Sequence, residues 1–406
     1  MAKNYIKYLL FLLTISFLTG CAKENSNLTN SSPVQTKDTG AIAPQSTEGT
    51  LEIITDSAAP APVEETEAVT NEDKAAEILS SMTLEEKIGQ MFFVRCPKEH
   101  ALEDISTYHL GGYILFGDDF KDKTPSDIKT TLSTYQKETK IPLLIGVDEE
   151  GGTVNRISKY SAFRKDPFQS PQDLYKEGGL DLIIRDTREK AELLKSLGIN
   201  VNLAPVCDVS TNPEDFINAR SFGKDASQTS DYVRAVVTEM KDSGVGSTLK
   251  HFPGYGDNVD THTGIAIDER SYETFQNSDF LPFQAGIESG ADSILVSHNV
   301  VTSMDHEYPA SLSGKVHDIL RSDLGFRGVI MTDDLSMDAI KDYTDEEEAA
   351  VLAISAGNDL VVATDYSIQI PAAITAVKNG DLSEARINES VTRILLWKLK
   401  LGLIEK

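Results

Sequence analysis

Residues 250–262 read KHFPGYGDNVDTH and gather, within one short stretch, side chains that could do chemistry. Lys250 and His251 open the stretch, and Asp260 and His262 close it. These residue types suit three kinds of site: a metal site, a phosphate site or a site of acid–base catalysis. We expect no metal, because neither a His-Glu-x-x-His motif nor paired cysteines accompany the histidines, and because Lys250 would place a positive charge beside the cation.

The middle of the same stretch disfavours a phosphate site. Phosphate-binding loops present glycines and backbone N–H groups at the start of a helix. Here Gly254 and Gly256 flank Tyr255, and the chain continues into polar sequence rather than into a helical pattern. Acid–base catalysis is the interpretation that remains.

Eight short apolar runs, which alternate with helical patterns from residue 84 onward, supply the elements that must position this stretch. The runs are continuous and rich in Val, Ile and Leu, which is typical of strands buried on both faces of a parallel sheet. Eight strand–helix alternations in roughly 320 residues predict an α/β fold, namely a (β/α)8 TIM-type barrel in a single domain. An open doubly wound sheet is the alternative, but no Gly-x-Gly-x-x-Gly turn follows the first run. The runs are Met91–Cys96, Gly112–Phe116, Leu143–Val147, Val201–Val206, Val245–Leu249, Ser293–Ser297, Val329–Thr332 and Asp359–Ala363.

Helical patterns fill the gaps between the runs, and a C-terminal pattern over Leu382–Leu403 predicts a last helix packed on the barrel. Several patterns stop at a glycine, which is a usual way for a helix to end. These glycines are Gly198, Gly244, Gly290, Gly325 and Gly357.

Polar side chains stand where successive runs end. Any one of them alone could be an ordinary polar group at a strand end. Because enzymes with this barrel place their chemistry at the carboxyl ends of the strands, the whole set predicts an active site there. Asp148 follows the third run, Asp208 the fourth, Lys250 and His251 the fifth, His298 the sixth and Asp333 the seventh.

Five motifs, in order, resemble those of glycoside hydrolase family 3, in its branch of β-N-acetylglucosaminidases, over residues 75–406. The resemblance implies a retaining, exo-acting hydrolase that releases non-reducing terminal GlcNAc from small carbohydrates of muropeptide or chitooligosaccharide type. It also implies that the enzyme uses no metal or organic cofactor. The motifs are VDEEGGTVNR (147–156), ARSFG (219–223), KHFPGYG with the following Asp-x-His (250–262), PASLS (309–313) and GVIMTDDLSM (328–337).

The resemblance implies a role for each matched residue. Asp333, the first of an Asp-Asp pair, is the expected nucleophile, His262 the expected general acid/base, and Asp260 the residue expected to orient His262. The residues expected to hold the terminal sugar are Asp148, Arg156, Arg220, Lys250 and His251.

The chemistry of the three catalytic candidates fits these roles. A retaining glycosidase needs a carboxylate nucleophile, and the seventh run is followed by one. A histidine can replace the usual carboxyl acid because its unperturbed pKa of about 6.5 lies near working pH. Residues i and i+2 point to the same side of an extended chain, so Asp260 could accept the second ring N–H of His262 and fix its tautomer.

The sequence also departs from the family pattern. Tyr255 stands where members commonly have histidine, the loop from Gly256 to Asp260 is a residue shorter than in many relatives, and the usual Leu-Pro is missing after His262. We expect no large second domain. A family 3 β-glucosidase, a β-N-acetylglucosaminide phosphorylase and a sugar-binding lipoprotein without catalysis are the alternatives.

The N-terminal residues indicate export and anchoring. Residues 1–20 combine lysines, an apolar run too short to span a membrane, and small residues before Cys21, which resembles a bacterial lipobox. We therefore expect a signal peptide over 1–20, lipidation at Cys21 and an extracytoplasmic protein anchored to the cell membrane. A short membrane anchor with an incidental cysteine is the alternative. Residues 21–70 are too polar to bury a core, which predicts a disordered tether before a folded catalytic domain over 71–406.

The formal net charge of −26 disfavours nucleic acid and anionic membrane surfaces as partners. We expect the protein to be a monomer. Besides Cys21 the chain has Cys96 and Cys207, each at the end of an apolar run, which predicts buried free thiols rather than a disulfide.

Overall fold

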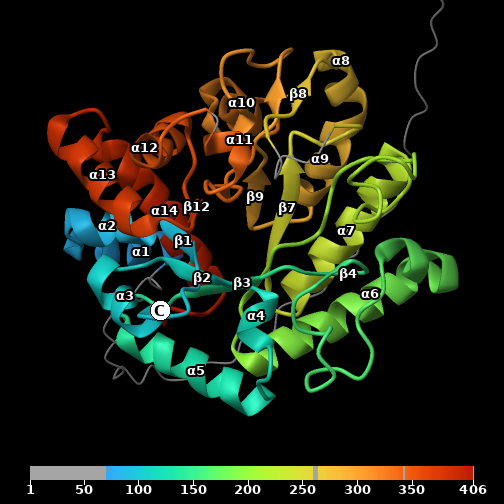
Figure 1. The fold of residues 1–406 in the computed structure, drawn as a ribbon, viewed down its shortest axis with the longest axis horizontal. Helices are drawn as coiled ribbons and strands as arrows, with labels where there is room; N and C mark the ends of the chain where they lie inside the picture. Colours follow the sequence, from blue (N-terminus) through green and yellow to red (C-terminus); the bar gives the residue numbers. More distant parts are fainter. Residues whose placement is uncertain (1–69, 259–263, 342, 406) are drawn as a thin grey trace, which may run out of the picture. The chain divides into compact units, whose positions relative to one another are not determined.

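The computed structural model describes residues 70–258, 264–341 and 343–405, in which eight parallel strands form a barrel with helices around it (Figure 1). The strands neighbour one another in chain order, and a bridge between Met331 and Leu360 joins the two ends of the sheet. The predicted (β/α)8 barrel is confirmed, and each of the eight apolar runs overlaps one strand. The barrel strands are β1 (Phe92–Arg95), β2 (Gly112–Leu115), β3 (Leu144–Val147), β6 (Val201–Asn202), β7 (Gly246–Phe252), β9 (Ser293–Val296), β11 (Val329–Thr332) and β12 (Val361–Ala363).

Helices connect the strands on the outside of the barrel, as Figure 1 shows. The glycines expected to end helices all have positive φ, from 68° at Gly325 to 124° at Gly357, a conformation in which a residue without Cβ is not strained. The helices and helical turns are α1 (Asn71–Ser81), α2 (Leu84–Gln90), α3 (Ala101–Tyr108), α4 (Gly117–Phe120), α5 (Pro125–Glu138), α6 (Pro171–Leu197), α7 (Ala226–Asp242), α8 (Tyr272–Thr274), η2 (Phe275–Asp279), α9 (Phe280–Glu288), η3 (Ala310–Leu312), α10 (Gly314–Asp318), η4 (Ile319–Asp323), α11 (Asp338–Lys341), α12 (Glu346–Ala356), α13 (Tyr366–Asn379) and α14 (Glu384–Lys400).

In the part of the chain that the structure describes, four short strands lie outside the barrel sheet. β4 (Glu149–Gly151) and β5 (Val154–Asn155) form an antiparallel hairpin directly after β3. β8 (Ile267–Asp268) and β10 (Val300–Val301) pair in parallel, and they belong to the segments that follow β7 and β9. Both pairs therefore extend the chain beyond the carboxyl ends of barrel strands.

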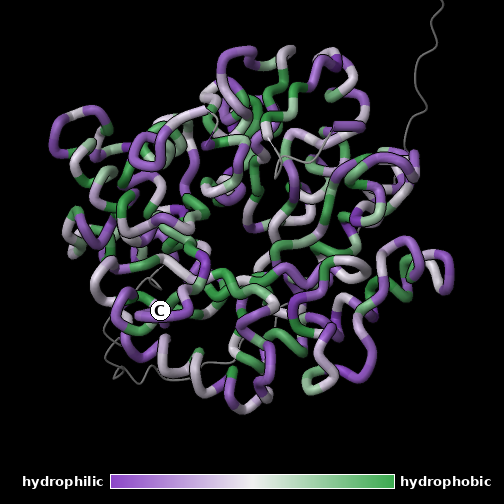
Figure 2. The backbone as a smooth tube through the Cα atoms, in the orientation of Figure 1, coloured by the Kyte–Doolittle hydropathy of each residue, from purple (hydrophilic) through white to green (hydrophobic). Residues whose placement is uncertain are grey.

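Large apolar side chains fill the barrel, and Figure 2 shows hydrophobic residues along the strands and hydrophilic ones on the outer turns. Phe93 of β1 is fully buried. A Cβ atom on Gly146 would lie 2.5 Å from Cζ of Phe93, and one on Gly112 would lie 2.8 Å from its Cδ2. The neighbouring strands β2 and β3 therefore carry glycine where the ring needs the space.

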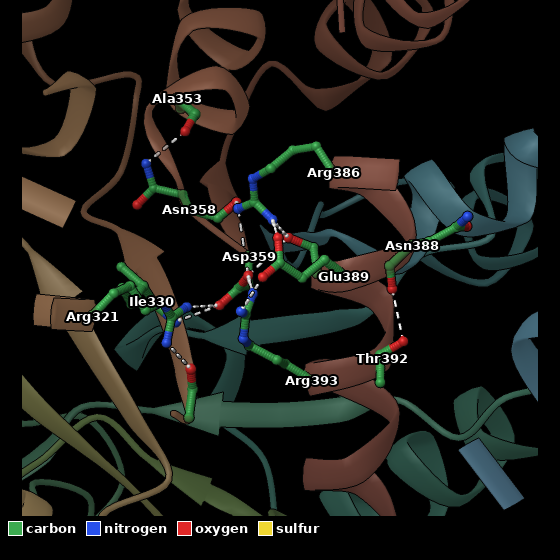
Figure 3. A network of polar contacts seen from close by, with 12 residues as sticks. Arg321, Ile330, Ala353, Asn358, Asp359, Arg386, Asn388, Glu389, Thr392 and Arg393 are labelled. Atoms are coloured by element: carbon green, nitrogen blue, oxygen red, sulfur yellow. Dashed lines mark hydrogen bonds and ion pairs between the residues drawn. The ribbon is translucent and has the colours of Figure 1, made fainter. Parts of the chain in front are cut away.

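A buried carboxylate ties the C-terminal helix to the barrel (Figure 3). Asp359 precedes β12, is fully buried, and contacts Arg321 of η4 at 2.5 Å and Arg393 of α14 at 3.0 Å. Arg386, also on α14, lies 3.4 Å away and donates to the carbonyl of Asn358. Glu389 of α14 also pairs with Arg386 and Arg393, so two carboxylates compensate the three guanidinium groups at the amino-terminal ends of the strands, the end that in such barrels serves stability.

Several of the predictions concern residues that the structure does not describe. The signal peptide, Cys21 and all of the predicted tether except Thr70, as well as Asp260 and His262, lie outside the described residues. Within the described part, no helix is both long and apolar enough to cross a membrane. Cys96 and Cys207 are free and buried, as predicted.

Candidate active site

A bulge in β7 places two adjacent side chains in one site. Lys250 and His251 were expected to follow the strand, but β7 continues to Phe252 and contains both. The pairing with β9 slips between Leu249 and Phe252, so that three steps of β7 lie opposite two steps of β9. Adjacent residues of a regular strand point to opposite faces, and the slip allows both side chains to reach the carboxyl end of the barrel.

The ammonium group of Lys250 lies between two carboxylates. Its Nζ donates to Oδ1 of Asp148 at 2.7 Å and is 2.6 Å from Oε1 of Glu150. The Lys250 side chain is only 2% exposed, so this charge is held by its partners rather than by water. Asp148 also pairs with Arg156 at 3.6 Å, which links the end of β3 to the end of the β4–β5 hairpin.

Glu150 joins Lys250 to a second cation. Arg220, in the loop that follows Asp208, donates from Nε to Oε2 of Glu150 at 3.0 Å and from one terminal nitrogen to Oε1 at 2.8 Å. Burial alone would raise the pKa of Glu150, but the charges of Lys250 and Arg220 outweigh it and hold that pKa well below its usual range. These contacts therefore favour the ionised form of Glu150.

His251 is oriented on both ring nitrogens. Its Nδ1 lies 2.8 Å from Oδ2 of Asp208, and its Nε2 lies 3.2 Å from a terminal nitrogen of Arg220. A guanidinium group can only donate, so Nε2 accepts, and the ring proton is on Nδ1, where it is donated to Asp208. Asp208 also accepts the backbone N–H of Tyr255 at 2.7 Å and so fixes the start of the following loop.

The β4–β5 hairpin is shaped by a second buried glutamate. Oε2 of Glu149 accepts the backbone N–H groups of Arg156 and Ile157, each at 2.8 Å, and Oε1 accepts that of Ser158 at 3.1 Å. A Cβ atom on Gly151 would lie 2.2 Å from a backbone oxygen, which is why the turn needs glycine there. The hairpin thus returns the chain to the site with Arg156 at its end.

Asp333 lies at the end of β11, on the edge where β7 ends. Its N–H donates to the carbonyl of Val296 at 3.0 Å, and its Oδ1 accepts the N–H of Asp334 at 2.8 Å. The Asp334 carboxylate accepts from Ser336 N–H and from the Thr364 hydroxyl, so it supports the neighbouring loops. His298, fully buried at the end of β9, lies with Nε2 3.0 Å from the Asp334 carbonyl.

All five residues predicted to hold a sugar therefore belong to one connected cluster, which we call the charge cluster: Asp148, Glu150, Arg156, Asp208, Arg220, Lys250 and His251. Glu150 was missed, although it lies two residues after Asp148 in extended sequence. Asp208 had been noted only for its place at a strand end. Among the described residues no group of His, Cys, Asp and Glu has the arrangement of a metal site.

The charge cluster is nearly neutral as a whole. Three carboxylates face three cations, and His251 is uncharged by its hydrogen bonds. Such a set offers many fixed donors and acceptors without net charge, which suits a neutral ligand rich in hydroxyl groups. Asp333 adds a carboxylate on the same edge of the barrel, where it could attack a carbon held by the cluster.

Comparisons with known proteins agree with this arrangement. The family model described as Glycosyl hydrolase family 3 N terminal domain matches residues 83–396. The chain is 31% identical to Beta-hexosaminidase A of Pseudoalteromonas piscicida over 74% of this chain and 55% of that protein. It is 34% identical to a Beta-hexosaminidase of Xylella fastidiosa (strain 9a5c) over 62% of this chain and 76% of that protein.

Among solved structures, a glycoside hydrolase family 3 beta-N-acetylglucosaminidase from Paenibacillus sp. str. FPU-7 superposes with a TM-score of 0.74 at 30% identity. The superposition covers 80% of this chain and 64% of that one. The chain thus spans about half of the Pseudoalteromonas protein and less than two thirds of the Paenibacillus protein.

Proposed function

Because the chain belongs to glycoside hydrolase family 3, we propose that it is a retaining β-N-acetylglucosaminidase that removes terminal GlcNAc from the non-reducing end of small carbohydrates. The observation that carries this proposal is the charge cluster on the same barrel edge as Asp333. The names printed for the relatives, beta-hexosaminidase and beta-N-acetylglucosaminidase, support the choice of the sugar.

We assign the nucleophile to Asp333. One of its oxygens attacks the anomeric carbon while the bond from that carbon to the leaving oxygen breaks, and a covalent glycosyl-Asp333 ester forms. The hydrogen bond from the Asp334 N–H orients the Asp333 carboxylate for this attack. The Asp334 carboxylate accepts hydrogen bonds from Ser336 and Thr364, which gives it a role in holding the neighbouring loops.

We assign the proton transfers to His262, with Asp260 as its positioning partner. His262 protonates the leaving oxygen in the first step. In the second step it removes a proton from the water that attacks the same carbon, while the bond from that carbon to the Asp333 oxygen breaks and releases the carboxylate. The charge cluster holds the terminal sugar. Its predicted members are Asp148, Arg156, Arg220, Lys250 and His251, and the structure adds Glu150 and Asp208. No metal or organic cofactor enters either step.

We further propose that the substrate is a peptidoglycan fragment and that the enzyme works as a monomer outside the cytoplasm, held to the membrane through a lipid on Cys21. The lipobox-like residues and the polar segment before Asn71 support this placement. Cys21→Ser should release the protein from the membrane fraction, and a chain that starts at Asn71 should keep the specific activity of the mature protein.

The test of the reaction compares aryl β-GlcNAc with aryl β-glucoside, with and without phosphate. We expect the GlcNAc compound to be hydrolysed preferentially and the free sugar to remain the product when phosphate is added. A preference for the glucoside, or a sugar 1-phosphate as product, would contradict the proposal. Asp333→Asn should lower kcat by several orders of magnitude and Asp334→Asn much less, whereas the reverse ranking would move the nucleophile.

His262→Ala separates the two steps. The variant should cleave a disaccharide far more slowly than the unmodified enzyme, because a sugar leaving group needs a proton, whereas nitrophenolate does not. Azide needs no base and should restore turnover of the aryl glycoside with a β-configured glycosyl azide as product. Equal losses on both leaving groups would remove His262 from this role.

A further inference from the structure

We propose that Arg95 is a specificity-determining residue that pairs with a carboxylate on the leaving sugar, in a groove beside the charge cluster. This inference rests on the proposed glycosidase function and names the chemistry of the leaving group. It concerns binding only and adds no chemical step.

Arg95 is tied to the site through an aromatic ring. It is the last residue of β1, and its guanidinium carbon lies 4.2 Å from the centroid of the Phe116 ring, just beyond β2. The guanidinium carbon of Arg156 lies 5.4 Å from the same centroid. One ring therefore contacts both Arg95 and an arginine of the charge cluster, so Arg95 lies one side chain away from the sugar site.

A groove of about 370 Å³ runs past Arg95, which is within the usual range of ligand pockets. Phe116 lines it on the side of the charge cluster, and Thr364 and Tyr366 line it beyond β12. Thr364 donates to the carboxylate of Asp334, the residue after the assigned nucleophile. The groove thus borders both the residues that hold the terminal sugar and the strand end that bears Asp333, where a leaving sugar would lie.

The groove is lined by two cations, Arg95 and Lys98, and by two carboxylates, Asp118 and Asp119. Arg95 is exposed, and among the described residues no carboxylate lies within ion-pair distance of it. Asp119 is the acidic residue that faces it, and Asp119 accepts the Phe116 N–H at 2.6 Å; burial raises the pKa of Asp119 more than Arg95 lowers it. The Lys98 ammonium, 4.0 Å from the well-exposed Asp118, lines the same groove.

Arg95 is therefore the one cation lining this groove for which the described structure shows no carboxylate within ion-pair distance. The charge cluster balances its own charges and needs no further anion, whereas the Arg95 guanidinium is exposed without a carboxylate partner in the described structure. The formal net charge of the chain is −26, so an exposed cation beside the site stands out. An anionic substituent on the leaving sugar would gain binding energy by pairing with it, whereas a neutral substituent would not.

The test uses two disaccharides with GlcNAc at the non-reducing end. In the first the reducing sugar carries a 3-O-lactyl carboxylate, and in the second the same group is the methyl ester, so the leaving oxygen is unchanged. We expect the unmodified enzyme to prefer the acid, and Arg95→Gln to lower the acid-to-ester ratio of kcat/KM about fivefold, the size of an exposed ion pair. Arg95→Lys should retain most of the ratio, and added salt should reduce it.

Arg327→Gln is the matched control, because Arg327 is exposed at the opposite end of the barrel, before β11, and the described structure shows no ion pair for it. The acid-to-ester ratio of kcat/KM for Arg327→Gln should equal that of the unmodified enzyme. If Arg95→Gln lowers kcat/KM for both disaccharides equally, Arg95 only supports Phe116 and the inference is overturned while the proposed function stands. Failure of the unmodified enzyme to cleave either disaccharide or aryl β-GlcNAc would instead overturn the proposed function.

Discussion

Replacing Glu150 by glutamine tests the buried charge network most directly, because this side chain holds two cations and almost no water reaches it. Its side chain is 4% exposed, and it contacts Lys250 at 2.6 Å and Arg220 at 2.8 Å. Glutamine keeps the size and the hydrogen-bonding oxygen but removes the charge. The substitution therefore changes electrostatics with little change in packing.

The expected loss of stability depends on which hydrogen-bonding and ionic partners Lys250 and Arg220 retain in the variant. Lys250 retains Asp148 at 2.7 Å, whereas Arg220 retains only the neutral ring of His251. Removing one partner of a buried ion pair commonly costs about 3–5 kcal/mol. Because one of the two cations keeps a carboxylate and Arg220 is partly solvated, we expect the low end of that range, about 3 kcal/mol of unfolding free energy. Displaced sugar-binding donors should lower kcat/KM about a hundredfold.

The pH dependence gives a second readout with a definite sign. The pKa of Glu150 is held below its usual value, so its contribution to stability is complete above the pKa of the unfolded chain, about 4.5, and is lost as pH falls further. Urea unfolding between about pH 6 and about pH 3.5 should show the unmodified protein losing stability faster than Glu150→Gln as pH falls. The two curves should therefore converge at low pH.

Glu189→Gln is a suitable control, since Glu189 forms an ion pair with Arg164 but is 56% exposed. We expect this change to cost less than about 1 kcal/mol. If Glu150→Gln is no more destabilising than Glu189→Gln, and if its stability has the same pH slope as that of the unmodified protein, the reasoning about buried charge in this site is refuted.

Other parts of the barrel give three further expectations. Lys398 is buried, its ammonium group donates to the neutral oxygens of Gln90 and Gly111, and burial lowers its pKa to about 7. The free energy of unfolding of the unmodified protein should therefore rise as the pH increases from about 7 to about 10, and this rise should be absent in Lys398→Met. Asp359→Asn should leave Arg321 without a carboxylate, while Arg386 and Arg393 keep Glu389, and should cost about 3 kcal/mol in urea unfolding, with sugar binding by the remaining folded protein unchanged. Gly146→Ala should push Cβ against Phe93 and lower the Tm by an amount that corresponds to about 1–3 kcal/mol, whereas an unchanged Tm would mean that the ring can move aside.

Local sequence was sufficient for the framework. An apolar run such as Val329–Thr332 carries its strand signal in its own residues, and it is observed as β11 with those bounds. Gly357 likewise marks the end of α12, because glycine lacks a Cβ atom and adopts a positive φ without strain wherever it stands. Asp148 and Asp333 could then be placed at strand ends by counting along the chain.

The partners within the site could not be predicted in this way. Lys250 meets Asp148 across 102 residues, and Arg220 meets Glu150 across 70. No local pattern states which carboxylate a lysine will face, and the bulge that turns Lys250 and His251 toward the same site depends on pairing with β9. Glu150 was missed for this reason.

Short segments of the sequence are therefore enough to predict the strands, their order and the residue types at their ends, because those follow from burial and backbone preference. Which charges neutralise one another, and which do not, depends on the folded barrel. Closing the barrel brings distant strand ends together, and each buried carboxylate must then find its cations there. Arg95 is left exposed beside Phe116 for the same reason, because no carboxylate among the described residues lies within ion-pair distance of it.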